Sequence, residues 1–111
     1  RQPLYVIAIN PQRNEIVVGS ESDLYADFLV ADRINLVAYE RLVGELAVTA
    51  KIRYRAPDVE AVASQPAPDR LAVRFSRPQR AITPGQAVVL YQGEEVVGGG
   101  TILYARREGS D

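Results

Sequence analysis

Basic side chains recur at every second position near the middle of the chain, at Lys51, Arg53 and Arg55. In an extended strand, alternate side chains point to one face and lie about 7 Å apart. That spacing approximates the phosphate repeat of a nucleic-acid strand, and the planar fork of Arg suits phosphate oxygens. The pattern is typical of a phosphate-binding face, although from the residues alone we favour a solvated face balanced by acids such as Glu45 or Glu60.

A second polar segment spans residues 77–86 and contains two prolines and one glycine. Proline fixes φ and glycine permits tight turns, so we expect Gln86 to be held in a defined place. A fixed amide both donates and accepts hydrogen bonds, which suits the edges of RNA bases and sugars. Arg77 and Arg80 are candidate RNA contacts by their position in the segment. From these residues alone, an ordinary solvated turn is the favoured alternative.

The residue types that are missing limit the chemistry of the chain, which has no Cys, no His, no Met and no Trp. Without Cys there is no thiolate nucleophile or soft metal ligand, and without His there is no ready proton shuttle near neutral pH. Gly98, Gly99 and Gly100 lack the following Lys and helix that a phosphate loop needs, so they predict a barrel bend or close backbone packing. Carboxylate and Lys chemistry remain formally open, but a free-standing enzyme is disfavoured, and we expect no catalytic residue, no metal ligand and no cofactor in this chain.

The net charge is −1, but the charges are unevenly distributed. Residues 51–80 hold seven basic and three acidic side chains, a net charge of +4, so the remainder carries −5. This separation favours RNA over a protein-only role. No apolar run approaches the roughly 18 residues that span a membrane, and no leader has the pattern of a signal peptide. Together with the lack of disulfides, this predicts a cytoplasmic protein with no membrane partner.

The elements that position these residues are predicted to be strands. Apolar and polar residues alternate with a period of two, and turn residues interrupt them at short intervals. In the strand expected at residues 45–55, Leu46, Val48, Ala50 and Ile52 fall on the core face. Further strands are expected at residues 4–9, 15–19, 28–31, 34–39, 59–63, 71–76, 87–91, 95–97 and 101–104. The pattern predicts an all-β protein with a small antiparallel β-barrel.

The predicted barrel occupies residues 23–106. The hairpin within residues 1–22 is expected to be the end of a preceding, central domain, and residues 107–111 are expected to form a loose tail. The chain starts with Arg1 inside a strand-like run rather than with Met. We therefore expect it to be a piece of a longer protein.

Three further stretches have a distinctive order and spacing: residues 51–55 (KIRYR), 78–86 (PQRAITPGQ) and 91–100 (YQGEEVVGGG). Together they resemble the carboxy-terminal part of the tRNA-specific 2-thiouridylases, a family once called tRNA (5-methylaminomethyl-2-thiouridylate) methyltransferases. Residues 5–11 and 16–19 resemble the end of that family's central domain. The chain departs from the family at Asn35-Leu36, where relatives often have Asn-Trp.

The resemblance implies a fold and an activity for a parent enzyme. Its last domain resembles domain II of translation elongation factors and helps to hold the tRNA in its anticodon region. An amino-terminal catalytic domain of the same parent chain uses ATP to adenylate the C2 oxygen of the wobble uridine, and a Cys persulfide then delivers sulfur. A sulfur-relay protein is a further possible partner. The catalytic parts have no counterpart in this chain, so we expect no activity from it alone.

The resemblance also assigns tRNA contacts. The family's Arg-Tyr pair falls on Arg53 and Tyr54, and its Gln contact falls on Gln86. Alternation instead puts Tyr54 on the apolar face with Ile52, so RNA contact there would need a bulge or a strand end near Arg53. The leading hypothesis is a tRNA-binding barrel. The alternative is a structural or protein-interaction barrel that packs on a catalytic domain without direct RNA recognition.

Overall fold

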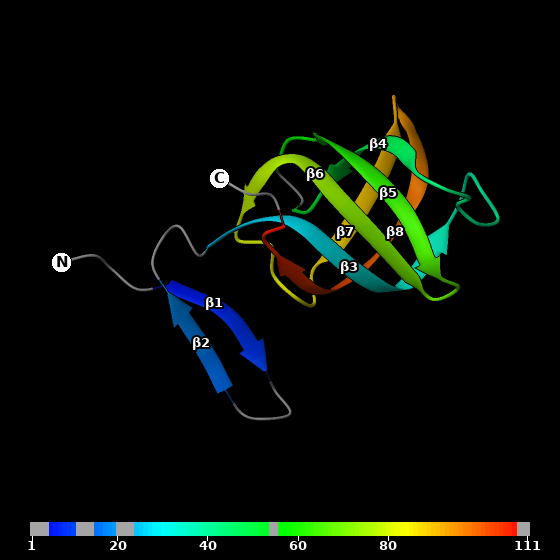
Figure 1. The fold of residues 1–111 in the computed structure, drawn as a ribbon. Helices are drawn as coiled ribbons and strands as arrows, with labels where there is room; N and C mark the ends of the chain where they lie inside the picture. Colours follow the sequence, from blue (N-terminus) through cyan, green and yellow to red (C-terminus); the bar gives the residue numbers. More distant parts are fainter. Residues whose placement is uncertain (1–4, 11–14, 20–23, 54–55, 109–111) are drawn as a thin grey trace.

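The computed structural model describes residues 5–10, 15–19, 24–53 and 56–108 of the chain (Figure 1). Within these ranges the chain forms eight strands joined by turns and bends, with no α-helix. It follows that these ranges hold no helix of the length and apolarity that a membrane span requires. The prediction of an all-β fold is confirmed.

The first two strands form a hairpin. β1 (Tyr5–Asn10) pairs antiparallel with β2 (Glu15–Gly19), and the register shifts between Val6 and Ala8. These strands make a two-stranded sheet of their own, separate from the sheet formed by the other six (Figure 1). The predicted strand pair is therefore present, and its place in a preceding domain stays a prediction.

The other six strands close into a barrel. They are β3 (Tyr25–Leu36), β4 (Leu46–Lys51), β5 (Val59–Ala67), β6 (Arg70–Arg80), β7 (Ala87–Gln92) and β8 (Glu95–Arg106). Their order around the barrel is β3-β6-β5-β4-β7-β8, and β8 pairs back to β3. Every neighbouring pair is antiparallel. The structure confirms the predicted antiparallel barrel.

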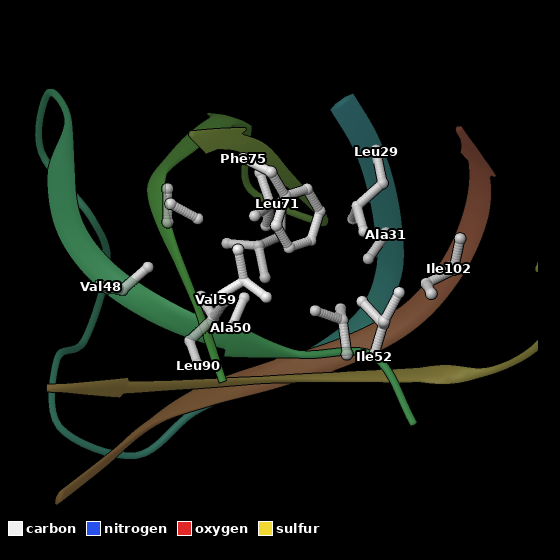
Figure 2. Packing of buried hydrophobic residues seen from close by; sticks show 14 of the residues in the cluster. Leu29, Ala31, Val48, Ala50, Ile52, Val59, Leu71, Phe75, Leu90 and Ile102 are labelled. Atoms are coloured by element: carbon white, nitrogen blue, oxygen red, sulfur yellow. The ribbon is translucent and has the colours of Figure 1, made fainter. Parts of the chain in front are cut away.

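The core fills the inside of this ring with alternate side chains from all six strands. Leu29, Val73 and Leu90 are 0% exposed, and Ile102 is 1% exposed. Figure 2 shows Leu29, Leu90 and Ile102 among the buried side chains, which the surrounding strands enclose. Full burial of one such side chain contributes about 1.5–3 kcal/mol, so this cluster is the main source of stability. No polar side chain is buried in the part of the chain that the structure describes.

Several strands are longer than local alternation predicted. β3 joins the segments expected at residues 28–31 and 34–39 into one strand that ends at Leu36. The irregularity between them is a bulge: Arg33 has a φ of 49°, and the register shifts between Asp32 and Asn35. A bulge disrupts the alternation while the strand continues. β5 passes through Pro66, and β6 includes residues 77–80, which the polar, proline-bearing sequence had placed in a loop.

The three consecutive glycines lie inside β8 and do not interrupt it. A Cβ on Gly98 would lie 2.5 Å from the backbone oxygen of Asn35, and one on Gly100 would lie 2.7 Å from that of Asp32. A Cβ on Gly99 would overlap the backbone oxygen of Val88. The prediction of close backbone packing is confirmed, whereas the expected interruption of the strand is wrong.

The segment that follows β8 is held to the barrel by side-chain contacts. The Arg106 guanidinium lies 2.6 Å from a carboxylate oxygen of Glu108, and the Glu108 amide donates a 2.7 Å hydrogen bond to Oδ1 of Asp27. The segment expected to be loose is therefore tied to β3 as far as Glu108, and residues 109–111 lie outside the described residues.

Candidate nucleic-acid interface

The basic run at residues 51–55 does not lie along one strand face. β4 ends at Lys51, and Ile52 and Arg53 follow in a bend. A strand needs partners, and the pairing with both neighbours stops here: the last paired residues are Ala50 with Val59 on β5 and Lys51 with Val89 on β7. The predicted strand end at Arg55 is therefore wrong. Tyr54 and Arg55 lie outside the described residues.

Lys51 projects from the end of β4 with a third of its side chain exposed. Its Nζ lies 3.7 Å from Oδ1 of Asp58, which is itself well exposed. Exposed ion pairs of this kind contribute little and are screened by salt. The ammonium therefore stays accessible to a second anion.

Arg53 is exposed and is fixed at its guanidinium end. Its Nη1 donates hydrogen bonds of 2.9 Å to the backbone oxygen of Arg80 and 3.1 Å to that of Ala81. Ala81 has a φ of 58°, which is uncommon for a residue other than glycine, and its amide donates a 2.8 Å bond to the oxygen of Leu24. Arg53 thus anchors the connection between β6 and β7 at its tightest point.

The same connection presents Gln86. The Gln86 backbone N–H donates a 3.2 Å hydrogen bond to the backbone oxygen of Thr83. The Gln86 backbone oxygen accepts a 2.8 Å hydrogen bond from the backbone N–H of Ile102. Gly85 has a φ of 92°, and its amide donates to the oxygen of Ile102 at 2.8 Å. The Gln86 backbone is therefore held on two sides while the residue remains exposed, as the Pro-Gly sequence predicted.

A surface groove of about 600 Å³ brings these residues together. Its lining comes from the end of β4, the bend after it, the β6–β7 connection and the outer face of β7. The lining residues are Lys51, Ile52, Arg53, Gln86, Ala87, Val89 and Tyr91. We call this the basic groove, because its lining has two cations and no carboxylate.

Two other predicted residues lie away from the basic groove. Arg77 and Arg80 are exposed on β6, and neither side chain lines it. The backbone oxygen of Arg80 nonetheless takes part through its bond from Arg53. Of the seven predicted site residues, the structure therefore unites Lys51, Arg53 and Gln86.

Tyr91 is the groove residue that sequence reasoning missed. On β7 the side chains of Val88 and Leu90 are fully buried, so Ala87, Val89 and Tyr91 must face outward. This alternation was readable from the sequence. The residue that pairs with Tyr91 could not be predicted from the sequence, and the structure shows that it is Thr49 on β4.

The described residues hold no group of three or more acidic side chains that could bind a metal ion. The lining of the basic groove instead offers cations, a primary amide and a phenol ring. Those groups bind phosphate, hydrogen-bond to sugars or base edges, and stack on bases. The arrangement is chemically suited to binding a nucleic acid.

Comparison with known proteins places the chain in a family. Residues 26–102 match the family model described as the aminomethyltransferase beta-barrel domain. A tRNA-specific 2-thiouridylase MnmA of Moorella thermoacetica is 50% identical over 101 residues, and MnmA 1 of Caldanaerobacter subterraneus subsp. tengcongensis is 48% identical over 101 residues. The enzyme of Lachnoclostridium phytofermentans is 44% identical over 102 residues.

These alignments cover 91–92% of this chain but only 28–29% of each relative. The chain thus spans just over a quarter of the length of the curated relatives it matches. The resemblance expected from the three sequence stretches is confirmed. The chain belongs to the aminomethyltransferase β-barrel domain family, in the form that tRNA-specific 2-thiouridylases carry.

Proposed function

We propose that this chain is the tRNA-contacting module of an ATP-dependent tRNA 2-thiouridylase that thiolates the wobble uridine at C2. The basic groove is the observation that carries the proposal, because it gathers Lys51, Arg53 and Gln86 on one surface. The names of the relatives supply the substrate class, tRNA. The contact would lie in the anticodon region, which is where the modified base sits.

The division of labour follows from chemistry. Sulfur transfer through a persulfide needs a Cys thiol, and this sequence has no Cys. ATP use and sulfur transfer are therefore assigned to an amino-terminal catalytic domain of the parent chain. A sulfur-relay protein in the cytoplasm could supply the sulfur to that domain. The barrel contributes charge and hydrogen bonds that hold the RNA.

The test is a titration of labelled tRNA with the 111-residue chain at several salt concentrations. With about three phosphates contacted, the logarithm of affinity should fall with the logarithm of salt concentration with a slope near −2 to −3. Lys51→Ala should reduce the slope by roughly one contact. Arg41→Ala is the matched control, since Arg41 is exposed on the β3–β4 connection and does not line the groove. Identical curves for Lys51→Ala and the unmodified chain would contradict the proposal.

The alternative function, a barrel that packs on the catalytic domain of the parent, has one observation in its favour. Val37 is 66% exposed and Val43 is 80% exposed, both on the β3–β4 connection. Tyr39 of this connection donates a hydrogen bond to Gln92, which lies at the opposite end of β7 from Gln86 and Ala87. An absence of tRNA binding at low salt would favour this alternative.

A further inference from the structure

A second groove adjoins the basic groove, and Tyr91 lines both. The second groove measures about 640 Å³ and runs from β6 across β5 and β4 to the end of β7 and the β7–β8 turn. Its outward-facing apolar lining includes Ala47 and Val62. Tyr91 therefore lies at the boundary between two grooves on the barrel surface.

The two grooves differ in charge. The basic groove has Lys51 and Arg53 with no carboxylate in its lining, and Asp58, which lies 3.7 Å from the Lys51 ammonium, is outside that lining. The second groove has one cation, Arg74, and one carboxylate, Glu60, and the guanidinium of Arg74 already lies 3.6 Å from Glu45. A phosphate is therefore attracted to the first groove and not to the second, whereas a flat, largely apolar group suits the second.

Tyr91 lies opposite a short side chain on β4. Its cross-strand neighbour is Thr49, a short side chain, and Thr49 in turn faces Glu60 on β5. Directly opposed residues on a sheet are about 5 Å apart at Cβ, so only the short Thr49 side chain lies between Tyr91 and Glu60. Glu60 is exposed and could accept a hydrogen bond from an exocyclic base amine.

We propose that the two grooves together form a subsite for one unpaired nucleotide, with its phosphate in the basic groove and its base stacked on Tyr91 over the second groove. The inference rests on the proposed RNA-binding function and adds the class of RNA that the site takes. Phosphate affinity and base stacking are the two devices by which proteins bind single strands. A base within a duplex is stacked on both faces and could not reach the ring.

The test uses a single-stranded heptaribonucleotide with one central 2-aminopurine, and the same strand annealed to its complement. Stacking quenches 2-aminopurine, so binding to the unmodified chain should lower its fluorescence in the single strand. Tyr91→Phe should retain the quenching. Tyr91→Ala should abolish it and weaken binding by about 5- to 150-fold, with the salt slope unchanged because no charge is lost.

Tyr104→Ala is the matched control, because Tyr104 is 44% exposed on β8 and lines neither groove. Thermal unfolding of each variant shows whether it is folded. Equal binding and quenching by Tyr91→Ala and the unmodified chain would overturn the inference, as would tighter binding of the duplex. Binding of tRNA without binding of the single strand overturns the inference and leaves the proposed function standing. Failure to bind either RNA overturns both.

Discussion

The guanidinium of Arg53 donates a 3.1 Å hydrogen bond to the backbone oxygen of Ala81, which lies 28 residues further along the chain. Thr83 Oγ1 donates to the same oxygen at 3.1 Å, and Thr83 accepts from the amide of Gln86. A continuous set of bonds therefore links Arg53 to the backbone of Gln86. Arg53 therefore fixes the segment that presents the Gln86 side chain, in addition to the RNA contact that we propose for it.

Arg53→Ala should loosen this segment in the absence of any RNA. Hydrogen bonds from a charged donor contribute about 1.5–3 kcal/mol each, so amide protection at Ala81 and Gln86 should fall by roughly tenfold or more in hydrogen exchange. Arg53→Lys keeps the charge but loses the planar fork, and should restore the salt slope of tRNA binding better than it restores protection. Unchanged hydrogen exchange in Arg53→Ala would show that the β6–β7 connection keeps its structure without the hydrogen bonds from Arg53.

Gln86→Ala should weaken tRNA binding and leave its salt dependence unchanged, because an amide carries no charge. The loss should be about 0.5–1.5 kcal/mol, the net value of a neutral hydrogen bond. Combined with Arg53→Ala, the two losses should be less than additive, since residues in one network share their effect. Gln79→Ala is the control, because the described hydrogen bonds of the Gln79 side chain go only to Arg77 and Pro78 beside it. Full additivity would count against the link between the two residues.

Leu90→Ala should destabilise the barrel by about 2–5 kcal/mol, measured by urea unfolding. Leu90 is 0% exposed at the centre of the ring, so its removal leaves a cavity. Leu103→Ala makes the same chemical change at a residue that is 38% exposed, and should cost less than about 1 kcal/mol. Similar losses for the two variants would mean that the barrel interior is not the core.

Gly99→Ala should be more harmful than its small size implies. The added Cβ would overlap the backbone oxygen of Val88 on β7, and backbone cannot rotate away as a side chain can. We expect a loss of about 1–3 kcal/mol by urea unfolding. Gly93→Asn is the comparison, since Gly93 has a φ of 62° in open space, a conformation that Asn tolerates. Equal stability of Gly99→Ala and the unmodified chain would contradict the packing of β8 on β7.

The isolated chain should neither thiolate tRNA nor turn over ATP. It has no Cys and no Met to carry sulfur. Incubation with tRNA, ATP and a sulfur donor, followed by nucleoside analysis, should show unmodified uridine. Formation of 2-thiouridine above the level of a protein-free control would overturn the assignment of chemistry to another domain.

The fold class was predictable because alternation is a local property. The core face expected from Val48, Ala50 and Ile52 is buried, and so are Leu71, Val73 and Phe75. Strand ends were less predictable, because they depend on partners distant in sequence. β4 stops where β5 and β7 stop pairing with it, and nothing within residues 45–55 records that limit.

The candidate site was predictable in its residue types but not in its geometry. The charges at Lys51 and Arg53 and the fixed turn before Gln86 were visible in the sequence. Their meeting in one groove depends on the closure of the barrel, which brings β4 beside β7. For the same reason the bond from Arg53 to Ala81 could not be foreseen: it turns an expected phosphate ligand into an anchor as well.

The closed ring of six strands decides how this domain can meet other molecules. In the barrel that the structure describes, β8 returns to β3, so no strand offers a free row of amides and carbonyls. An open edge would accept any extended peptide, including a copy of itself, by backbone pairing. Here specificity has to reside in side chains and connecting loops. Such a domain can be fused to a large neighbour or concentrated in a cell without strand exchange, and its surface can evolve new partners while the sheet stays constant.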